Sequence, residues 1–484
     1  MSEYSDTLVW LLGFAGVFAI LGIVYTRKQT DTLEDYVVAR NSQTALATVF
    51  TLMATSLGAW ILFAPAQAAT WGGLAAITGY ALGSMAPRMA MVPLGRRMRT
   101  LIPRGHTLSE YVVARYGGVM YALVLIIMLF YMFITLTAEI TAVAKLVSLI
   151  APVPLWLTAL IVLVATLTYT YHGGLKASIM TDKVQMLVIV PLLLMLILYG
   201  WLAIGDLDYA LHTLKIQSPG LVDVTDGTGI KAGFTFFVAI LLTGLFHQGN
   251  WQRVYAAESI RAMQKGFFIA GICIVPIVFV MGLFGLAYVA LDAGTDSSVA
   301  LFSVILNTLP GWFVVALLPL GLALAMSSTD TVISAFSSLV AVDGQRLVRN
   351  ASPATMLKLS RWVIVPLSVP VWLAASKGYS VLYLFLLADL LCSAAAFPVF
   401  FGLYSRRYDG FSASVSTLTG VVAGLLLFPA PDQPSVYLLE SFLLAAVTPV
   451  LVSLVLLRFR PNQAEYDLSR LDSLIRRVHG QEQV

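Results

Sequence analysis

The chain has 484 residues, of which 59% are hydrophobic and only 11% are charged. Soluble globular proteins carry roughly 25% charged residues, so this composition excludes them and predicts a membrane protein that is surrounded by the lipid bilayer. The formal net charge of +4 is modest. Because the basic residues lie in loops, that charge reports membrane orientation and excludes nucleic acid as a partner.

Apolar segments long enough to cross about 30 Å of hydrocarbon as helices recur along the chain. They predict an all-α polytopic membrane protein with about 13 transmembrane helices. The segments cover residues 8–26, 44–71, 73–95, 118–148, 155–172, 183–204, 231–249, 266–291, 310–341, 357–374, 379–403, 411–429 and 435–457.

Arginine and lysine residues set the predicted orientation. With the amino terminus outside, most of the 29 basic residues fall in loops on the cytoplasmic side of the plasma (inner) membrane, as the positive-inside rule requires. The carboxyl terminus is then cytoplasmic. The first segment has neither a basic leader nor a cleavage pattern, so we expect it to be a retained helix.

The same orientation contains an internal repeat. Segments 2 to 6 begin at the cytoplasmic face and segments 7 to 11 begin at the external face, so the two sets of five are inverted. This architecture is typical of secondary transporters, whose site lies mid-membrane where the first helix of each set is interrupted. The predicted units are a leading helix and loop at 1–43, repeats at 44–204 and 231–404, an external loop at 205–230, two trailing helices at 405–457 and a cytoplasmic tail at 458–484.

Both first helices contain small and polar residues at mid-length. Segment 2 has them at 54–60, and segment 7 has them at 243–250. Glycines in membrane helices also permit close packing, but their occurrence at matching places favours interruptions. Between segments 5 and 6, Gly173 and Gly174 predict a tight turn, after which Thr181 or Asp182 could cap the next helix.

Segment 9 gathers oxygen atoms on one helical face. Ser327, Asp330 and Thr331 are spaced at i, i+3 and i+4, so they point the same way. Hard cations need oxygen ligands, and an interruption near Ala54 would add free carbonyls. We therefore interpret Ser327 and Ser328 as cation ligands, whereas later serines of this helix are expected to bond their own backbone.

Charged residues inside the segments are candidates for function, because an unpaired charge in a bilayer costs several kcal/mol. Glu139 is expected to face a cavity. Asp389 is either a hydrogen-bonded core acid or a solute contact, and both interpretations stay open. Glu440, in the last segment, suggests an accessory role. Arg88 is expected to extend toward the cytoplasmic interface, with a gate pair to a carboxylate as the alternative.

Several motifs together resemble the sodium:solute symporter family. They are the Gly173-Gly174-Leu175-Lys176-Ala177 turn, Thr181-Asp182 with Gln185, Ser327-Ser328, and Gln252-Arg253 with Ala256-Ala257. The resemblance spans nearly the whole chain and includes local similarity, over 95–117, to the urea and polyamine branch. It implies a leucine-transporter-like fold, with an extra leading helix and two trailing helices.

The resemblance also implies a sodium site made by carbonyls of Ala54, Leu57 and Leu324 and by hydroxyls of Ser327 and Ser328. A further cation site in some members would correspond here to Asp182, Ser327, Asp330 and Thr331. The family more often has a small residue at the position of Asp330. The added carboxylate could strengthen a cation site, carry a proton or pair with a cationic group.

In related transporters the solute cavity lies beside the two interruptions and segments 4 and 11. An aromatic and acidic lining would suit a small cationic or amide-bearing solute, such as an amino acid, urea or a polyamine, and the substrate itself stays open. The implied lining residues are Trp60, Phe63, Gln67, Glu139, Phe246, His247, Gln248 and Asp389.

The sequence therefore predicts a secondary active transporter that couples a small polar solute to sodium by alternating access, with no cofactor. No transition metal is expected, because histidines such as His247 have no second ligand nearby. The alternatives are proton coupling through Asp182 or Asp330, and a solute sensor acting through a partner. We do not expect an enzyme, because no nucleophile elbow or metal motif is present.

Overall fold

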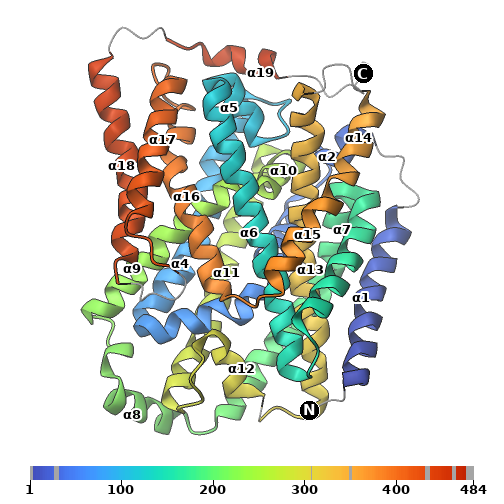
Figure 1. Ribbon diagram of the computed structural model, residues 1–484, viewed down its shortest axis with the longest axis vertical. Coiled ribbons are helices and arrows are strands. Elements are labelled where there is room, and N and C mark those ends of the chain that lie inside the picture. The colour runs from blue at the N-terminus through green and yellow to red at the C-terminus, as the bar shows by residue number, and fades with distance from the viewer. Residues whose placement is uncertain are drawn as a thin grey trace.

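The structure, a computed structural model, describes residues 4–26, 32–306, 308–347, 352–430, 436–460 and 465–475. Within these residues the chain is helical, and an isolated bridge between Gln43 and Ala257 is its one β-pairing. The long helices run between two ends of the molecule (Figure 1). The lower end in that view carries α8 (Leu207–Gln217) and α12 (Ala300–Ile305), and the upper end carries α2 (Leu33–Val37), α5 (Leu108–Tyr116) and α19 (Leu471–Leu474).

Nine helices of the described residues are long and apolar enough to cross a membrane. This confirms the all-α polytopic class, whereas the count of thirteen spans stays a prediction. The remaining helices outside the broken ones are α1 (Tyr4–Thr26), α6 (Gly118–Ile150), α7 (Leu155–Ile204), α11 (Ile260–Ala290), α13 (Gly311–Leu347), α14 (Pro353–Trp362), α15 (Ile364–Ala375), α16 (Val381–Phe401), α17 (Gly410–Leu425) and α18 (Leu438–Phe459).

Two helices are broken at the places that the sequence indicates. In the first, α3 (Ala45–Ser56) ends, Leu57 and Gly58 are non-helical, and η1 (Ala59–Leu62) leads into α4 (Ala64–Leu101). In the second, α9 (Gly227–Leu241) is followed by η3 (Thr243–Phe246), an extended His247 and α10 (Gln248–Ala256). Each break leaves backbone groups without helical partners.

Helices α4 and α7 are also kinked, each at a glycine with positive φ. In α4 the kink lies at Gly72 and Gly73, where Gly73 has φ +59 and lies against the carbonyl of Leu221. In α7 it lies at Gly174, which has φ +52. The helix resumes directly at Gly174, so the expected start at 183 is wrong. Asp182 therefore lies inside α7 and caps no helix.

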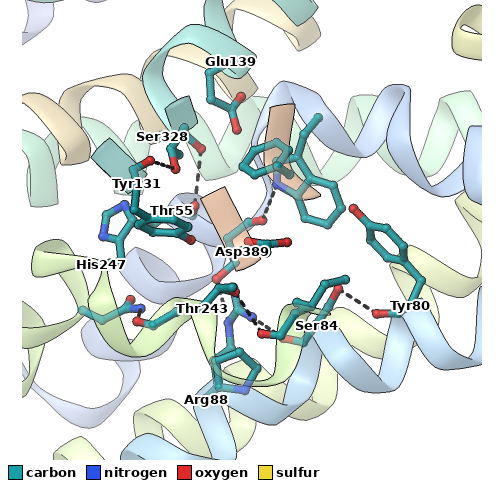
Figure 2. Close-up of a pocket in the computed structure, with 18 residues that line it drawn as sticks. Thr55, Tyr80, Ser84, Arg88, Tyr131, Glu139, Thr243, His247, Ser328 and Asp389 are labelled. Atoms are coloured by element: carbon teal, nitrogen blue, oxygen red, sulfur yellow. Dashed lines mark hydrogen bonds between the residues drawn. The ribbon is translucent and has the colours of Figure 1, made fainter. Parts of the chain in front are cut away.

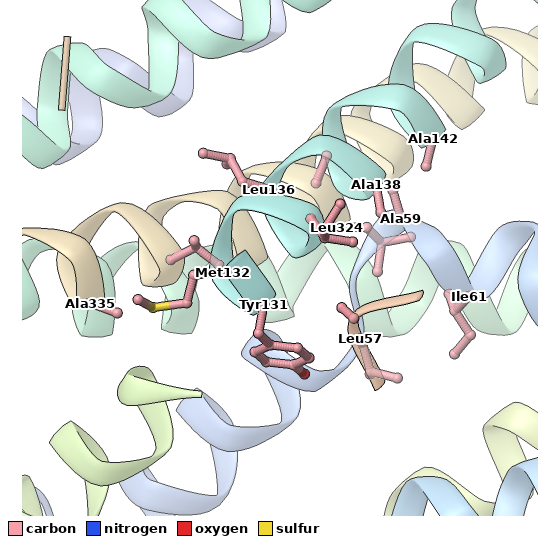
Figure 3. Packing of buried hydrophobic residues seen from close by; sticks show 14 of the residues in the cluster. Leu57, Ala59, Ile61, Tyr131, Met132, Leu136, Ala138, Ala142, Leu324 and Ala335 are labelled. Atoms are coloured by element: carbon pink, nitrogen blue, oxygen red, sulfur yellow. The ribbon is translucent and has the colours of Figure 1, made fainter. Parts of the chain in front are cut away.

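The first break is enclosed by apolar packing. Figure 3 shows Leu57 and Ala59 beside residues of α6 and α13, among them Leu136, Ala138 and Leu324. All five of these residues are almost fully buried. Close packing on both sides holds the extended residues of the break in one conformation.

The described tail residues fold back over the upper end of the molecule. Leu471 of α19 is buried, and Nε of Arg104 donates to Asp472 at 2.7 Å. The hydroxyl of Tyr466 donates to the carbonyl of Ala114, at 2.8 Å. The tail is thus joined to α5 and to the loop before it, although residues 461–464 and 476–484 of the predicted tail lie outside the described residues.

Candidate functional site

A pocket lies beside the first break and is lined by residues of both broken helices and of α6, α13 and α16 (Figure 2). Four of the predicted solute contacts line it: Trp60, Glu139, His247 and Asp389. Ser328, predicted as a sodium ligand, also lines it. The tertiary structure therefore brings together one residue from each of five separated stretches of the chain.

The other four predicted contacts lie outside this pocket, because each side chain faces a different helix or loop. They are Phe63, whose ring lies 4.9 Å from that of Phe302; Gln67, which accepts from Ser380 at 3.0 Å; Phe246, whose ring lies 6.0 Å from that of Phe400; and Gln248, which donates to the carbonyl of His106 at 2.9 Å.

The pocket also contains residues that the sequence reasoning missed. Tyr131 and Thr135 precede Glu139 by eight and four positions on α6, so helical periodicity from Glu139 would have found them. Tyr80 and Ser84 precede Arg88 on α4 at the same spacing. The positions four and eight residues before each charged residue within a helix would therefore have identified all four of these residues.

Arg88 corrects an expectation, because it lines the pocket instead of extending to the interface. Its Nε donates to the hydroxyl of Ser56 at 2.8 Å, and its Nη1 donates to the carbonyl of Ser84. The side chain thus spans from α4 to the end of α3. Within the described residues it forms no ion pair with a carboxylate, so the gate-pair alternative has no support in this conformation.

Asp389 on α16 faces the pocket, with 4% of its surface exposed. Among the residues that the structure describes, its carboxylate has no hydrogen-bond or ion-pair partner. The aromatic residues Trp60, Tyr80, Tyr131 and Phe385 line the same pocket. The interpretation of Asp389 as a hydrogen-bonded core acid is therefore not supported by these contacts, and a carboxylate in an aromatic enclosure suits a cation.

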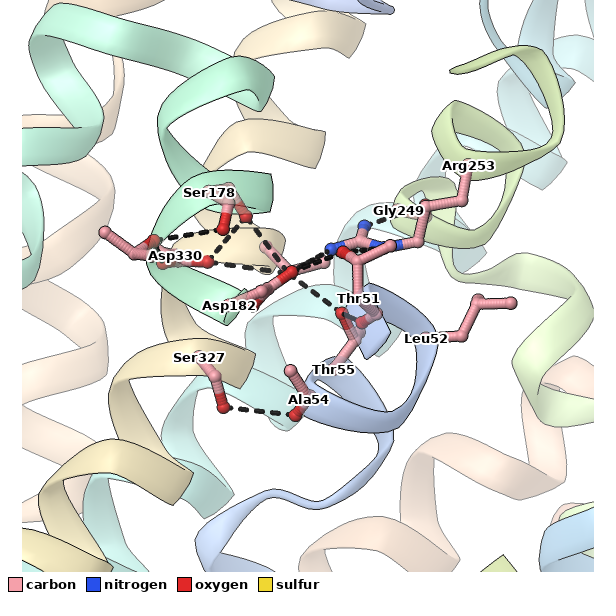
Figure 4. Close-up of polar contacts among 12 residues, drawn as sticks. Thr51, Leu52, Ala54, Thr55, Ser178, Asp182, Gly249, Arg253, Ser327 and Asp330 are labelled. Atoms are coloured by element: carbon pink, nitrogen blue, oxygen red, sulfur yellow. Dashed lines mark hydrogen bonds and ion pairs between the residues drawn. The ribbon is translucent and has the colours of Figure 1, made fainter. Parts of the chain in front are cut away.

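Ser327, a predicted sodium ligand on α13, lies beside Ala54 near the end of α3 (Figure 4). The hydroxyl of Ser327 lies 3.1 Å from the carbonyl of Ala54 and 2.9 Å from that of Leu324. The hydroxyl of Ser328 lies 3.3 Å from the carbonyl of Thr55. Leu57 is the first residue beyond α3. These hydroxyl and carbonyl oxygens are the donor set that a small hard cation prefers.

A buried ion pair lies next to these oxygens. Nη2 of Arg253 donates to Oδ2 of Asp182 at 2.9 Å and to the hydroxyl of Thr331 at 2.9 Å. Thr51 also donates to the same carboxylate oxygen. Both charged side chains have no exposed surface, and Figure 4 shows the guanidinium of Arg253 beside Asp182. Arg253 therefore occupies part of the second cation site implied by the resemblance.

Asp330 is bonded by hydroxyl groups of α7. Its carboxylate accepts hydrogen bonds from Tyr169 at 2.8 Å, from Ser178 at 2.7 Å and from Thr181 at 2.9 Å. The other oxygen of Asp182, Oδ1, is buried without a hydrogen-bond partner. The group as a whole contains two carboxylates for one guanidinium.

A profile of the sodium:solute symporter family matches residues 36–457. A spermidine transporter of Candida albicans is 25% identical over 431 residues, which cover 87% of this chain and 80% of that protein. A sodium/proline symporter of Haemophilus influenzae is 24% identical over 482 residues, which cover 91% and 92%. A sodium/pantothenate symporter of Escherichia coli is 26% identical over 286 residues, which cover 56% and 57%.

Solved structures share the fold. A Na+-coupled sialic acid symporter, in a substrate-bound outward-open state, matches with a TM-score of 0.77 at 19% identity over 96% of this chain and 99% of that one. A transporter of the nucleobase-cation-symport-1 family matches with a TM-score of 0.56 at 13% identity, over 91% and 99%. The predicted leucine-transporter-like fold is thereby confirmed.

Proposed function

The chain belongs to the sodium:solute symporter family, a family of secondary active transporters, and on that premise we propose that its solute is a small organic cation. The observation that carries the proposal is Asp389, a buried carboxylate without a partner among the described residues. An intramembrane carboxylate in this state is costly. A cationic solute would pair with it, and the faces of Trp60, Tyr80 and Tyr131 would add cation-π attraction.

The charges of the pocket fit this assignment. Arg88 is held by Ser56 and Ser84, and Glu139 accepts from a backbone N–H of the break. Asp389 is the remaining negative group of the lining, so an amine would compensate its charge. The similarity to a spermidine transporter supports an amine, and the relatives that carry proline or pantothenate define the competing solutes.

Sodium would bind between the first break and α13, through carbonyls of Ala54, Leu57 and Leu324 and hydroxyls of Ser327 and Ser328. Ser328 and Thr55 also line the solute pocket, so the two sites share a wall. Sodium would favour the conformation in which that wall is formed and so raise the affinity for the solute. This is a population shift, which requires that sodium bind this conformation more tightly than the others.

The second cation site at Asp182, Asp330 and Thr331 is also a proposal. Two carboxylates and one guanidinium leave one negative charge when both acids are ionised. That charge could be compensated by a second cation or by a proton, so proton coupling through Asp182 or Asp330 is the alternative function. We place the protein in the plasma (inner) membrane, with the amino terminus outside and the carboxyl terminus in the cytoplasm.

The test is charge movement in proteoliposomes on addition of putrescine, choline, urea, proline, glucose or lactate, in sodium chloride and in potassium chloride. An amine should produce a sodium-dependent current. Asp389→Asn should lower the apparent affinity for that amine about 10- to 100-fold, because it removes a charged partner worth about 1.5–3 kcal/mol. The matched control is Glu440→Gln. Glu440 lies on α18 and pairs with Lys231 of α9, and its substitution should leave the affinity unchanged.

Other results would contradict these proposals. A current driven best by proline or glucose, or an amine affinity unchanged in Asp389→Asn, would overturn the assignment of a cationic solute. Amine currents that persist in potassium chloride and vanish when a proton gradient is dissipated would move the coupling to Asp182 or Asp330. No current with any solute would favour a sensor.

A further inference from the structure

Glu139 on α6 lies beside the first break and is only 1% exposed. Figure 2 shows it at one side of the pocket. Its Oε2 accepts a hydrogen bond from the backbone N–H of Ala59 at 2.6 Å. Ala59 follows the non-helical Leu57 and Gly58, so the break has removed the helical partner of this N–H group. The carboxylate of Glu139 takes its place.

The backbone of the break is shaped around this carboxylate. A Cβ on Gly58 would lie 1.9 Å from Oε1 of Glu139, a distance that no side chain can adopt. The absence of a Cβ at this position leaves room for the carboxylate where it lies. Glu139 reaches the break from 80 positions along the chain, so the contact is made by the packing of α6 against the break.

Backbone N–H groups exposed by a broken helix are where transporters of inverted-repeat architecture bind the anionic group of their solutes. In this chain the protein itself supplies the anionic group at that place. A carboxylate on a solute would compete with Glu139 for the same donor, and two like charges at close range repel each other. Asp389, across the pocket, adds a second negative group.

We propose that Glu139 determines specificity: its carboxylate fills the position at which a solute carboxylate would bind, so the pocket accepts amines and rejects the corresponding amino acids. This inference rests on the proposed transport of an organic cation and adds which cations are taken. It assigns a different role to each acid of the pocket. Asp389 attracts the amine, and Glu139 excludes the carboxylate.

The test compares putrescine with ornithine, which is putrescine bearing one added carboxylate. Sodium-dependent uptake of both is measured for the wild type, Glu139→Ala and Glu139→Gln. The wild type should prefer putrescine, and Glu139→Ala should lower the putrescine-to-ornithine preference at least about tenfold by freeing a hydrogen-bond donor to a charged group. Glu139→Gln, which removes the charge but keeps the size, should lower it less.

Thr137→Val is the matched control, since Thr137 is buried on the same helix and bonds the carbonyl of Phe133. It should leave the preference unchanged. Equal uptake of putrescine and ornithine by the wild type, or an unchanged preference in Glu139→Ala, would overturn the inference while the amine transport stands.

A second measurement does not depend on transport. Acetate should raise the thermal unfolding midpoint of purified Glu139→Ala above its value in sodium chloride of equal concentration, because acetate replaces the missing carboxylate at Ala59. The wild type should show no such difference. If the wild type takes up neither putrescine nor choline, the proposed cationic solute is wrong, and the acetate comparison alone decides whether the break binds a carboxylate. No acetate effect on Glu139→Ala would overturn that role.

Discussion

At the scale of single residues, two serines on α13 have different environments. The hydroxyl of Ser327 lies between the carbonyls of Ala54 and Leu324, which belong to different helices. The hydroxyl of Ser337, ten positions later, bonds the carbonyl of Ile333 on its own helix at 3.0 Å. Ser327 therefore connects α13 to the break, whereas Ser337 bonds only within its own helix.

This difference yields a prediction for sodium. Ser327→Ala removes one proposed oxygen ligand, and a partner of a charged group is worth about 1.5–3 kcal/mol, so the apparent sodium affinity should fall about tenfold or more. The measurement is the sodium dependence of solute-driven current in proteoliposomes. Ser337→Ala is the control and should leave that dependence unchanged. A Ser327→Ala protein with wild-type sodium dependence would speak for proton coupling instead.

At the scale of the elements, the break between α3 and η1 serves two neighbouring sites. Carbonyls near the end of α3 face the hydroxyls of α13, and the first N–H of η1 faces Glu139. Pro65 lies in the first turn of α4, where its missing N–H group costs no helical hydrogen bond. One interruption thus presents acceptors to the proposed sodium and a donor to a carboxylate.

Gly58 is the element's most constrained position. Gly58→Ala should reduce transport, because its Cβ would lie 1.9 Å from Oε1 of Glu139 and would displace that carboxylate from the N–H of Ala59. Uptake by protein of equal expression measures the effect. Gly13→Ala in α1, where a Cβ meets nothing within 4 Å, is the control. The double variant Gly58→Ala/Glu139→Ala should take up as much solute as Glu139→Ala alone, and a further loss would contradict the assigned clash.

At the scale of the whole molecule, charged groups join distant segments at the upper end in Figure 1. Glu34 of α2 pairs with Arg40 at 2.7 Å and with His106 at 2.6 Å. Arg40 also donates to the carbonyls of Pro103 and Gly105. His106 lies 3.3 Å from Glu110 of α5. The network ties the start of the chain to the loop between α4 and α5.

These pairs make stability depend on pH. Burial alone would lower the pKa of His106, but Glu110 and Glu34 outweigh it and raise the pKa to about 9. Burial alone would raise the pKa of Glu34, but His106 and Arg40 lower it to about 2. The histidine contribution is complete below its ordinary pKa of 6.5 and is lost as pH rises through 9. The glutamate contribution is complete above 4.5 and is lost as pH falls through 2.

The thermal unfolding midpoint in detergent should therefore fall as pH is raised from 7 to 9.5. The loss is on the order of 3 kcal/mol, since each unit of pKa corresponds to about 1.4 kcal/mol. His106→Gln should be less stable at pH 7 and should show a smaller decline toward pH 9.5. His212→Gln, on the exposed face of α8, should keep the wild-type profile. A wild-type decline that persists unchanged in His106→Gln would refute this origin.

The sequence alone determined the class, the family and the places where helices are interrupted. Each of these depends on local properties: twenty apolar residues make a span, and small and polar residues at 54–60 and 243–250 permit a break. The serine pair at 327–328 was equally visible, because its spacing relative to Asp330 follows from the helical period.

The tertiary structure decided what each buried charge meets. Arg253 with Asp182, Glu139 with Ala59, and Arg88 with Ser56 are separated by 71, 80 and 32 positions, and no local pattern encodes such pairs. They follow from the angles at which α4, α6, α7 and α10 pack around the two breaks. Periodicity predicts which residues share a face of one helix, but only the packing of several helices determines which faces meet, and therefore which of the acids is left for the solute.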